Sequence, residues 1–233
     1  DVSGFDQPIL TDENGSFHMT VENNWSGVIT PSKSDHQFSP ISLSISSSHD
    51  STHLSFEAQT SEILFVNPNA TGNGDGSSWA NAYTDLRSAL QSIKSFDEVW
   101  VAEGTYTAGG FRSNLFLIPP QVSVYGGFSG SETSREQRDP VTNQTILSGD
   151  IGTVGDGSDN AFHLVIPSDG SHLDGFFIKE GNATENYSDD RGKGGGLFAK
   201  GVTFTVANTT FQGNQAYQKG GAVYLYEANA TFS

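Results

Sequence analysis

The sequence of 233 residues contains no cysteine, few basic residues and no long apolar run. The absence of cysteine excludes disulfides, thiol catalysis and zinc sites with cysteine ligands. The 27 acidic and 11 basic residues give a formal charge of −16, so phosphate-bearing partners such as nucleic acid and anionic lipid are disfavoured by repulsion. No run of about 18 apolar residues is present, so we expect no transmembrane segment. Cations and neutral polymers remain as partners.

The composition is also informative about location. Ser, Thr, Asn and Gly are abundant, and with the acidic balance and the missing cysteine this is typical of an exported bacterial surface protein. We therefore expect an extracellular or cell-surface localisation. Residues 1–4 show neither the charged nor the apolar region of a signal peptide, so such a signal is expected to have been removed or not included.

A glycine-rich element recurs near the carboxyl end of the sequence. Gly194-Gly-Gly-Leu197 is followed by Gly220-Gly-Ala-Val223 after 26 positions (220 − 194), and only short strand-like segments lie between the two copies. A unit of this length cannot bury an apolar face by itself, so successive units must stack and share one core. Within a unit, Val202, Phe204 and Val206 fall on one face of a strand. The pattern predicts stacked β-strand coils.

The same stretch resembles a known family. Phe211-Gln-Gly-Asn214 followed by the glycine element at 220–223 is similar to the paired repeats of polymorphic outer-membrane proteins, which are right-handed parallel β-helices of the pectin-lyase-like class. An earlier copy, Ile178 to Asn182 followed by Gly194 to Leu197, departs from the repeat. The resemblance implies that Asn214 belongs to a ladder of asparagines at the corners of successive coils.

The resemblance to bacterial surface β-helices and polysaccharide lyases extends over residues 63–233. A helix is predicted over Asp85 to Lys94, with Thr84 as its N-cap and an apolar stripe of Leu86, Ala89, Leu90 and Ile93. We expect this helix to cap the first coil and to cover Trp79 and Trp100. Residues 130–143 and 150–160 are interpreted as loop insertions. A first full coil strand and its corner are expected within Glu98–Tyr106. Further coil strands are expected at Ile63–Val66, Val122–Tyr125, Thr145–Leu147, His163–Ile166 and Phe176–Ile178.

Residues 1–59 are predicted to form a small β-sandwich. Short alternating strands are expected at Ser16–Val21, Gly27–Thr30, Ile41–Ile45 and Leu54–Phe56. The segment resembles carboxypeptidase-regulatory-like or collagen-adhesin B-type modules, which act as stalks or spacers. This resemblance implies that the first strand of the module is missing. We also expect the β-helix to be truncated at its C-terminus, because a solenoid usually ends in a cap.

Two kinds of site are considered. A lyase of this fold needs a basic residue as base and a cation to neutralise the substrate carboxylate. The candidates Lys179, Arg191, Lys193, Lys200 and Lys219 match no lyase motif, so solvated surface charges are the favoured interpretation. Asp150, Asp156 and Asp159 concentrate carboxylates in a glycine-rich loop, as a calcium site requires, although turn formation explains the same residues.

The sequence thus predicts an all-β chain, with a small β-sandwich followed by a right-handed parallel β-helix that carries one N-terminal capping helix. The expected function is a non-catalytic, exported, adhesin-like scaffold that displays loops. Calcium is the cofactor considered, with Asp150, Asp156 and Asp159 as its ligands. The alternatives are a carbohydrate-active β-helix, either a uronate lyase or a glycan-binding module, and a filament subunit. The expected partners are a polysaccharide or cell-surface glycan, or neighbouring protein subunits.

Overall fold

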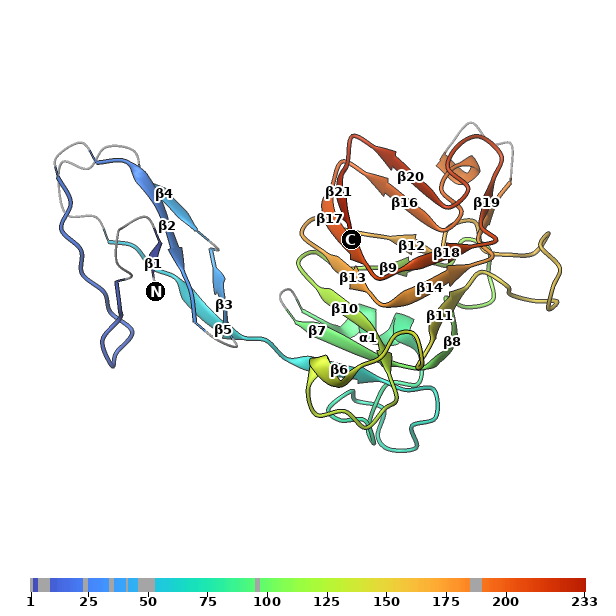
Figure 1. The fold of residues 1–233 in the computed structure, drawn as a ribbon, viewed down its shortest axis with the longest axis horizontal. Helices are drawn as coiled ribbons and strands as arrows, with labels where there is room; N and C mark the ends of the chain where they lie inside the picture. Colours follow the sequence, from blue (N-terminus) through green and yellow to red (C-terminus); the bar gives the residue numbers. More distant parts are fainter. Residues whose placement is uncertain are drawn as a thin grey trace. The chain divides into compact units, whose positions relative to one another are not determined.

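The computed structural model describes residues 2–3, 9–22, 25–33, 36–40, 42–45, 53–94, 97–184 and 190–233. The chain divides into two compact units, residues 1–61 and residues 62–233. Figure 1 shows the first unit in blue to teal and the second in teal to red. No helix in the described part of the chain is both long and apolar enough to cross a bilayer.

The first unit contains two small antiparallel sheets. One has the order β1 (Val2–Ser3), β2 (Gly27–Pro31), β4 (Leu43–Ile45), and the other pairs β3 (His36–Ser39) with β5 (Glu57–Thr60). Ile29 in β2 is fully buried. Antiparallel sheets agree with the expected all-β unit, whereas the face-to-face sandwich and its likeness to an adhesin module stay predictions.

Two of the predicted strands in this unit are wrong. Residues 16–21 form no strand, although Phe17, Met19 and Val21 are half-buried and alternate with exposed neighbours as the sequence pattern requires. The strand expected at residues 54–56 begins three residues later as β5. The alternation of apolar and polar residues therefore predicted which side chains are half-buried, but not whether the backbone pairs with a neighbouring strand. Ile41 lies outside the described residues.

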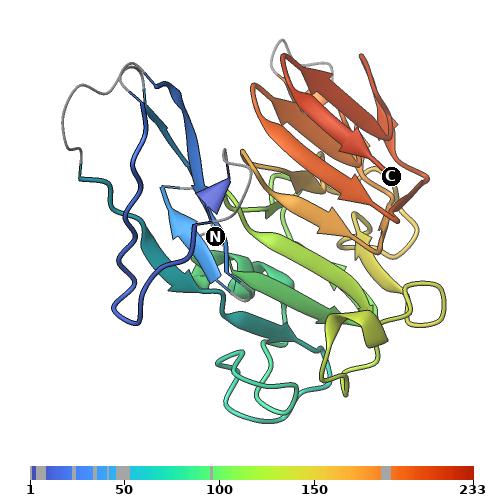
Figure 2. The same cartoon turned by 60° about the vertical axis from the view of Figure 1, so that its left-hand side comes forward.

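The second unit consists of three parallel sheets that the chain visits in the same order on every turn. Figure 2 shows their strands stacked from the teal β6 to the red β21. The first sheet contains β6 (Ile63–Val66), β7 (Glu98–Ala102), β10 (Ser123–Phe128), β13 (His172–Asp174), β17 (Thr203–Ala207) and β21 (Asn229–Phe232). The second contains β8 (Gly104–Thr107), β11 (Thr145–Ser148), β14 (Phe176–Lys179) and β18 (Thr210–Gln212). The third contains β9 (Phe116–Leu117), β12 (Val165–Ile166), β16 (Leu197–Lys200) and β20 (Val223–Tyr226).

The glycine recurrence marks successive coils, as predicted. Leu197 pairs with Val223 in a parallel register, and the Gly196 amide donates to the Gly221 carbonyl at 3.2 Å. Close approach of other backbones requires glycine here, because a Cβ on Gly196 would lie 2.6 Å from the Ala222 carbonyl oxygen. The two glycine clusters therefore stack one strand apart, which confirms the parallel β-helix.

The earlier copy departs from the repeat by one residue, in agreement with the sequence. Ile178 pairs with Phe211, so Asn182 lies opposite Gln215 and not opposite Asn214. Glu180 occupies the corner that Gly213 occupies in the next coil, and both have positive φ, 64° and 67°. Because a glutamate stands at a corner that favours glycine, the sequence does not reveal that residues 180 and 213 are equivalent.

Columns of apolar side chains fill the interior of the coils. Val99, Val124, Leu173 and Val206 pair in register across four strands of the first sheet, and all are buried. Full burial of each such side chain contributes about 1.5–3 kcal/mol. The shared column explains why the coils are stable only as a stack.

The single described helix is α1 (Leu86–Ser92), within the predicted range. Leu86, Ala89 and Leu90 are buried in the same core cluster as Val99, and the helix contacts β6, β7 and β9. The expected N-cap was wrong: Asp85 caps the helix, because its Oδ1 accepts the Ser88 amide at 2.8 Å. The function of the helix as an end cap stays a prediction.

A second cluster of aromatic residues lies on the outer face of the first sheet. Phe65, Trp100 and Tyr125 are in register on β6, β7 and β10, and they alternate with the inward Leu64, Val99 and Val124. Trp79 and Phe128 complete the cluster, with the rings of Trp100 and Phe128 stacked 4.8 Å apart. The expectation that the tryptophans pack against the helix was wrong, because α1 lies in the core on the opposite face of this sheet.

Candidate functional site

Loops that join the second sheet to the third gather at one corner of the β-helix. Residues 149–164 connect β11 to β12, residues 180–196 connect β14 to β16, and residues 213–222 connect β18 to β20. Each loop leaves the same sheet and enters the same sheet, so the loops of successive coils lie above one another. The short strands β15 (Asn182–Ala183) and β19 (Gln215–Ala216) pair two of them directly.

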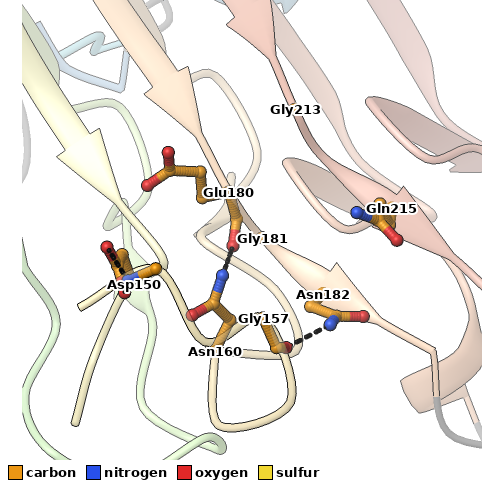
Figure 3. Close-up of a pocket in the computed structure, with 9 residues that line it drawn as sticks. Asp150, Gly157, Asn160, Glu180, Gly181, Asn182, Gly213 and Gln215 are labelled. Atoms are coloured by element: carbon orange, nitrogen blue, oxygen red, sulfur yellow. Dashed lines mark hydrogen bonds between the residues drawn. The ribbon is translucent and has the colours of Figure 1, made fainter. Parts of the chain in front are cut away.

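A pocket of about 220 Å³ lies at this corner, between the loops of three coils (Figure 3). Its lining is polar and contains two carboxylates and three side-chain amides, with glycines between them. The residues that line it are Asp150, Gly155, Gly157, Asn160, Glu180, Gly181, Asn182, Gly213 and Gln215.

Two buried asparagines of the pocket lining each have a side-chain oxygen without a hydrogen-bond partner. The side-chain nitrogen of Asn160 donates to the Glu180 carbonyl at 2.8 Å, and that of Asn182 donates to the Gly157 carbonyl. Asn160 and Asn182 are only 7% and 8% exposed, and the Oδ1 atom of each is buried without a hydrogen-bond partner. An unpaired buried acceptor costs about 1–3 kcal/mol, so both oxygens favour a ligand that supplies positive charge or a donor.

Arg112 holds the two asparagines in place from outside the pocket. Its Nε donates to the Asn160 carbonyl at 2.8 Å and its Nη2 to the Asn182 carbonyl at 3.2 Å. The guanidinium also lies 4.2 Å from the centre of the Phe162 ring. One planar group therefore ties two coils together. Sequence reasoning missed Arg112, because an isolated arginine in a loop carries no motif.

The buried Ser148 hydroxyl links the backbone of Asp150 to the carboxylate of Glu180. Ser148 accepts the Asp150 amide at 3.1 Å and donates to Glu180 Oε2 at 3.3 Å. The Asp150 carboxylate accepts the Gly155 amide, with oxygen distances of 3.1 and 3.0 Å. Neither carboxylate takes part in the ion pairs found within the described residues. The corner thus holds two carboxylates outside these ion pairs, with the Arg112 guanidinium bound to the neighbouring backbone carbonyls of Asn160 and Asn182.

Of the three aspartates predicted to bind a metal, only Asp150 lines the pocket. Asp156 accepts the Ser158 hydroxyl at 2.7 Å and the Ser158 amide at 2.9 Å, and these bonds lower the pKa of the carboxyl. Asp159 accepts the Thr153 amide at 2.8 Å through Oδ2, while its buried Oδ1 has no partner. Across the described part of the chain, no three carboxylates or imidazoles gather as a metal cluster. Calcium at these three aspartates stays a prediction.

Of the five basic residues considered for a lyase, Lys193, Lys200 and Lys219 are grouped around Asp190, whereas Lys179 lies on β14 of the second sheet. Lys193 and Lys200 both pair with Asp190, at 3.0 and 3.7 Å, in the loop that contains the short 3-10 helix at Asp190–Gly192. Lys179 lies 5.6 Å from the ring centre of Phe177. Arg191 contacts the Phe162 ring, and Lys219 forms a parallel backbone bridge with Lys193. The structure does not bring these five residues together on one coil face.

Sequence reasoning missed two arginines that do approach a strand face. Arg135 and Arg138 come from the 130–143 insertion, which contains the 3-10 helix at Arg135–Gln137, and both guanidinium groups lie over the Tyr125 ring. Arg138 pairs with Asp174 at 2.6 Å and Arg135 pairs with Glu98 at 2.9 Å. These pairs fasten the insertion to the first sheet.

Ionisation in this cluster follows from burial and pairing. Burial disfavours the charged Asp174, but hydrogen bonds from Asn208 and Arg138 outweigh it and hold the pKa below its ordinary value. Burial lowers the pKa of His172 and raises the pKa of Tyr125. The histidine is thus kept neutral beside an ionised carboxylate.

A third feature is a strip of rings on the outer face of the third sheet. Phe198 pairs with Tyr224 and Lys200 pairs with Tyr226, and all four side chains alternate with the inward Leu197. The rings of Phe198 and Tyr224 are stacked 5.8 Å apart, and the Tyr226 side chain is 45% exposed. Lys200 lies 5.5 Å from the Tyr226 ring centre. In contrast to the first sheet, this strip is open to solvent at Tyr226.

Three parallel sheets, which the chain visits in a fixed order from β7 onward, define a parallel β-helix. The chain belongs to a family described as protein of unknown function (DUF1565), whose model matches residues 70–232. This is a family of right-handed β-helices of the pectin-lyase-like class, which confirms the class expected from the sequence. No curated protein and no solved structure matches the chain.

Proposed function

We propose that this chain is a non-catalytic, adhesin-like scaffold of an exported surface protein, in which the β-helix displays the loops of its corner between the second and third sheets. The observation that carries the proposal is the stacking of these loops on a common edge, where three successive coils contribute to one polar pocket. A rigid stack that presents variable loops is a typical arrangement for binding.

The state of the basic residues supports a non-catalytic function. The two arginines on the first sheet are engaged with Glu98 and Asp174, and Lys193 and Lys200 share Asp190. A lyase must offer positive charge to the substrate carboxylate and a base to its α-proton. Groups already neutralised by carboxylates supply neither function without breaking a pair.

The proposal of export is supported by composition. The chain combines a formal charge of −16 with the absence of cysteine. Fractionation of the native producing organism, followed by immunodetection, tests this part of the proposal. We expect the protein in the surface or extracellular fraction, and exclusive recovery from the cytoplasm would contradict it.

Incubation with alginate, pectin and chondroitin, followed by ultraviolet absorbance of the unsaturated product, separates the scaffold from a lyase. We expect no product with any of the three polymers, including in the presence of calcium. Steady product formation by the purified chain would replace the scaffold with an enzyme.

A glycan is the partner that we propose for the scaffold, through the rings of Tyr224 and Tyr226, which lie beside the buried Phe198. Flat rings on a solvent-facing sheet provide an apolar surface for the faces of sugar rings, and the adjacent Lys200 provides a hydrogen-bond donor. Each stacking contact contributes about 0.5–1.5 kcal/mol.

Binding to immobilised glycans tests this partner. The double variant Tyr224→Ala/Tyr226→Ala should lose about tenfold in affinity, which corresponds to about 1.4 kcal/mol. Tyr217→Ala is the matched control, because Tyr217 is 58% exposed and lies in the corner loop away from the strip. Equal loss in both variants, or no binding by the unaltered chain, would contradict the assignment.

A further inference from the structure

The free groups of the corner pocket are mainly hydrogen-bond acceptors. The side-chain nitrogens of Asn160 and Asn182 donate hydrogen bonds to backbone carbonyls, whereas the side-chain oxygens of both residues receive no hydrogen bond. The charged side chains in the lining are the carboxylates of Asp150 and Glu180. A site composed in this way requires a ligand that is positively charged or rich in donors.

We propose that this pocket binds a calcium ion, with the carboxylates of Asp150 and Glu180 and the side-chain oxygen of Asn160 as its protein ligands. Figure 3 shows these three side chains on one side of the Gly181 backbone, while Asn182 and Gln215 lie on the other side. The site shares only Asp150 with the three aspartates that the sequence suggested.

Calcium fits this set of donors better than magnesium does. All the donors are hard oxygens, and they combine carboxylate and amide groups from two different loops. Calcium accepts six to eight such oxygens in irregular geometry, whereas magnesium demands a near-ideal octahedron and releases its water reluctantly. A volume of about 220 Å³ leaves room for several water ligands.

A sugar fits the pocket less well than an ion. No aromatic side chain is among the lining residues, so a sugar ring would find no apolar surface there. The two carboxylates also take part in none of the ion pairs found among the described residues, and a neutral sugar would bring no countercharge to them. A divalent cation satisfies the charge and the unpaired oxygens together.

The consequence of binding would be to join two coils. Asp150 and Asn160 flank the insertion after β11, and Glu180 lies at the corner after β14 in the next coil. An ion held by both loops fixes the insertion against the stack. The inference goes beyond the proposed scaffold function and does not depend on whether the partner is a glycan.

Calorimetric titration of chelator-treated full chain with calcium chloride tests the site. We expect one calcium per chain and an increase in the melting temperature, since a ligand that binds only the folded state stabilises it. Asp150→Asn and Glu180→Gln should each weaken the affinity at least about tenfold, because each removes one charge from the ion's ligands. Titration with magnesium chloride should give markedly weaker binding.

Asp156→Asn is the matched control, since it removes the same charge from the same insertion but changes a residue outside the pocket. It should bind calcium as the unaltered chain does. The proposal is overturned if calcium produces neither heat nor stabilisation, if magnesium binds as well, or if Asp156→Asn weakens binding as much as the two pocket variants. Circular dichroism verifies folding, and Glu180→Gln decides the outcome if Asp150→Asn does not fold.

Discussion

The first and third sheets of the β-helix both direct aromatic side chains outward, yet only one of them leaves part of its row open to solvent. On the first sheet, Trp100 and Phe128 are 4% and 0% exposed. On the third sheet, Tyr226 is 45% exposed. Both rows occupy equivalent, outward positions of parallel strands, so strand periodicity does not explain the difference.

The difference arises from what the chain places over each sheet. The 130–143 insertion docks on the first sheet through Arg135 and Arg138, and the Trp79 indole donates to the Glu132 carbonyl at 2.9 Å. The outward row of the first sheet is therefore a second core, and that of the third sheet is a candidate binding surface. Substitutions on the two faces should separate stability from binding.

Phe128→Ala should have the largest effect on stability. The side chain is fully buried and stacked on Trp100, so its removal leaves a cavity and should lower the free energy of unfolding by about 3–5 kcal/mol. Denaturant unfolding measures the change. Phe111→Ala is the control, because Phe111 is 75% exposed and should change stability by less than about 0.5 kcal/mol. Equal effects would refute the second core.

Arg138→Met should have the next largest effect on the free energy of unfolding. Arg138 and Asp174 have side chains that are only 15% and 10% exposed, so loss of the arginine leaves a poorly hydrated carboxylate and should cost about 3 kcal/mol. Arg135→Met provides the comparison, because the Arg135 side chain is 40% exposed and surface pairs contribute about 0–1 kcal/mol. Chemical denaturation of both variants should show this order, and the reverse order would show that Arg135 fastens the insertion.

A smaller effect is expected from pH. Burial holds the pKa of His172 below 6.5, with Asp174, Arg138, Arg135 and Tyr125 around it. The unfolded chain therefore takes up a proton first, and stability should fall as the pH drops through about 6.5 toward the folded pKa. Melting temperatures between about pH 7.5 and 5 measure this loss.

The variant His172→Gln should show a shallower decline over the same range. The range stays above the ordinary Asp174 pKa of 3.8, so that carboxylate remains ionised in both states and does not contribute. An identical decline in the variant would assign the pH dependence to other groups.

Tyr226→Ala should have the smallest effect on stability. Its ring lies on the open outer face, so the free energy of unfolding should change by less than about 0.5 kcal/mol, in contrast to Phe128→Ala. Thermal unfolding measures it. A loss of more than about 2 kcal/mol would mean that the third sheet carries a packed outer layer like the first.

The coil pattern was predictable because it is local and periodic. Alternation around Val202 to Val206 and the repeated glycines were enough to place Leu197 above Val223. The pocket was not predictable in the same way. Asp150 was identified from a carboxylate-rich loop, whereas Glu180, Asn160 and Asn182 stand in different loops and share no spacing. Only the winding of the coils brings them to one corner.

The sequence by itself determined the β-helix, its single helix within residues 85–94 and the positions of its loop insertions, because strand alternation, glycine corners and capping residues act over a few neighbours. The tertiary structure decided the alignment of Asn182 with Gln215, the burial of Trp100 beneath an insertion, and which residues line the pocket together with Asp150. These three features depend on loop insertions of unequal length. Such insertions change the spacing between residues of neighbouring coils, so no constant interval in the sequence reveals which residues lie together.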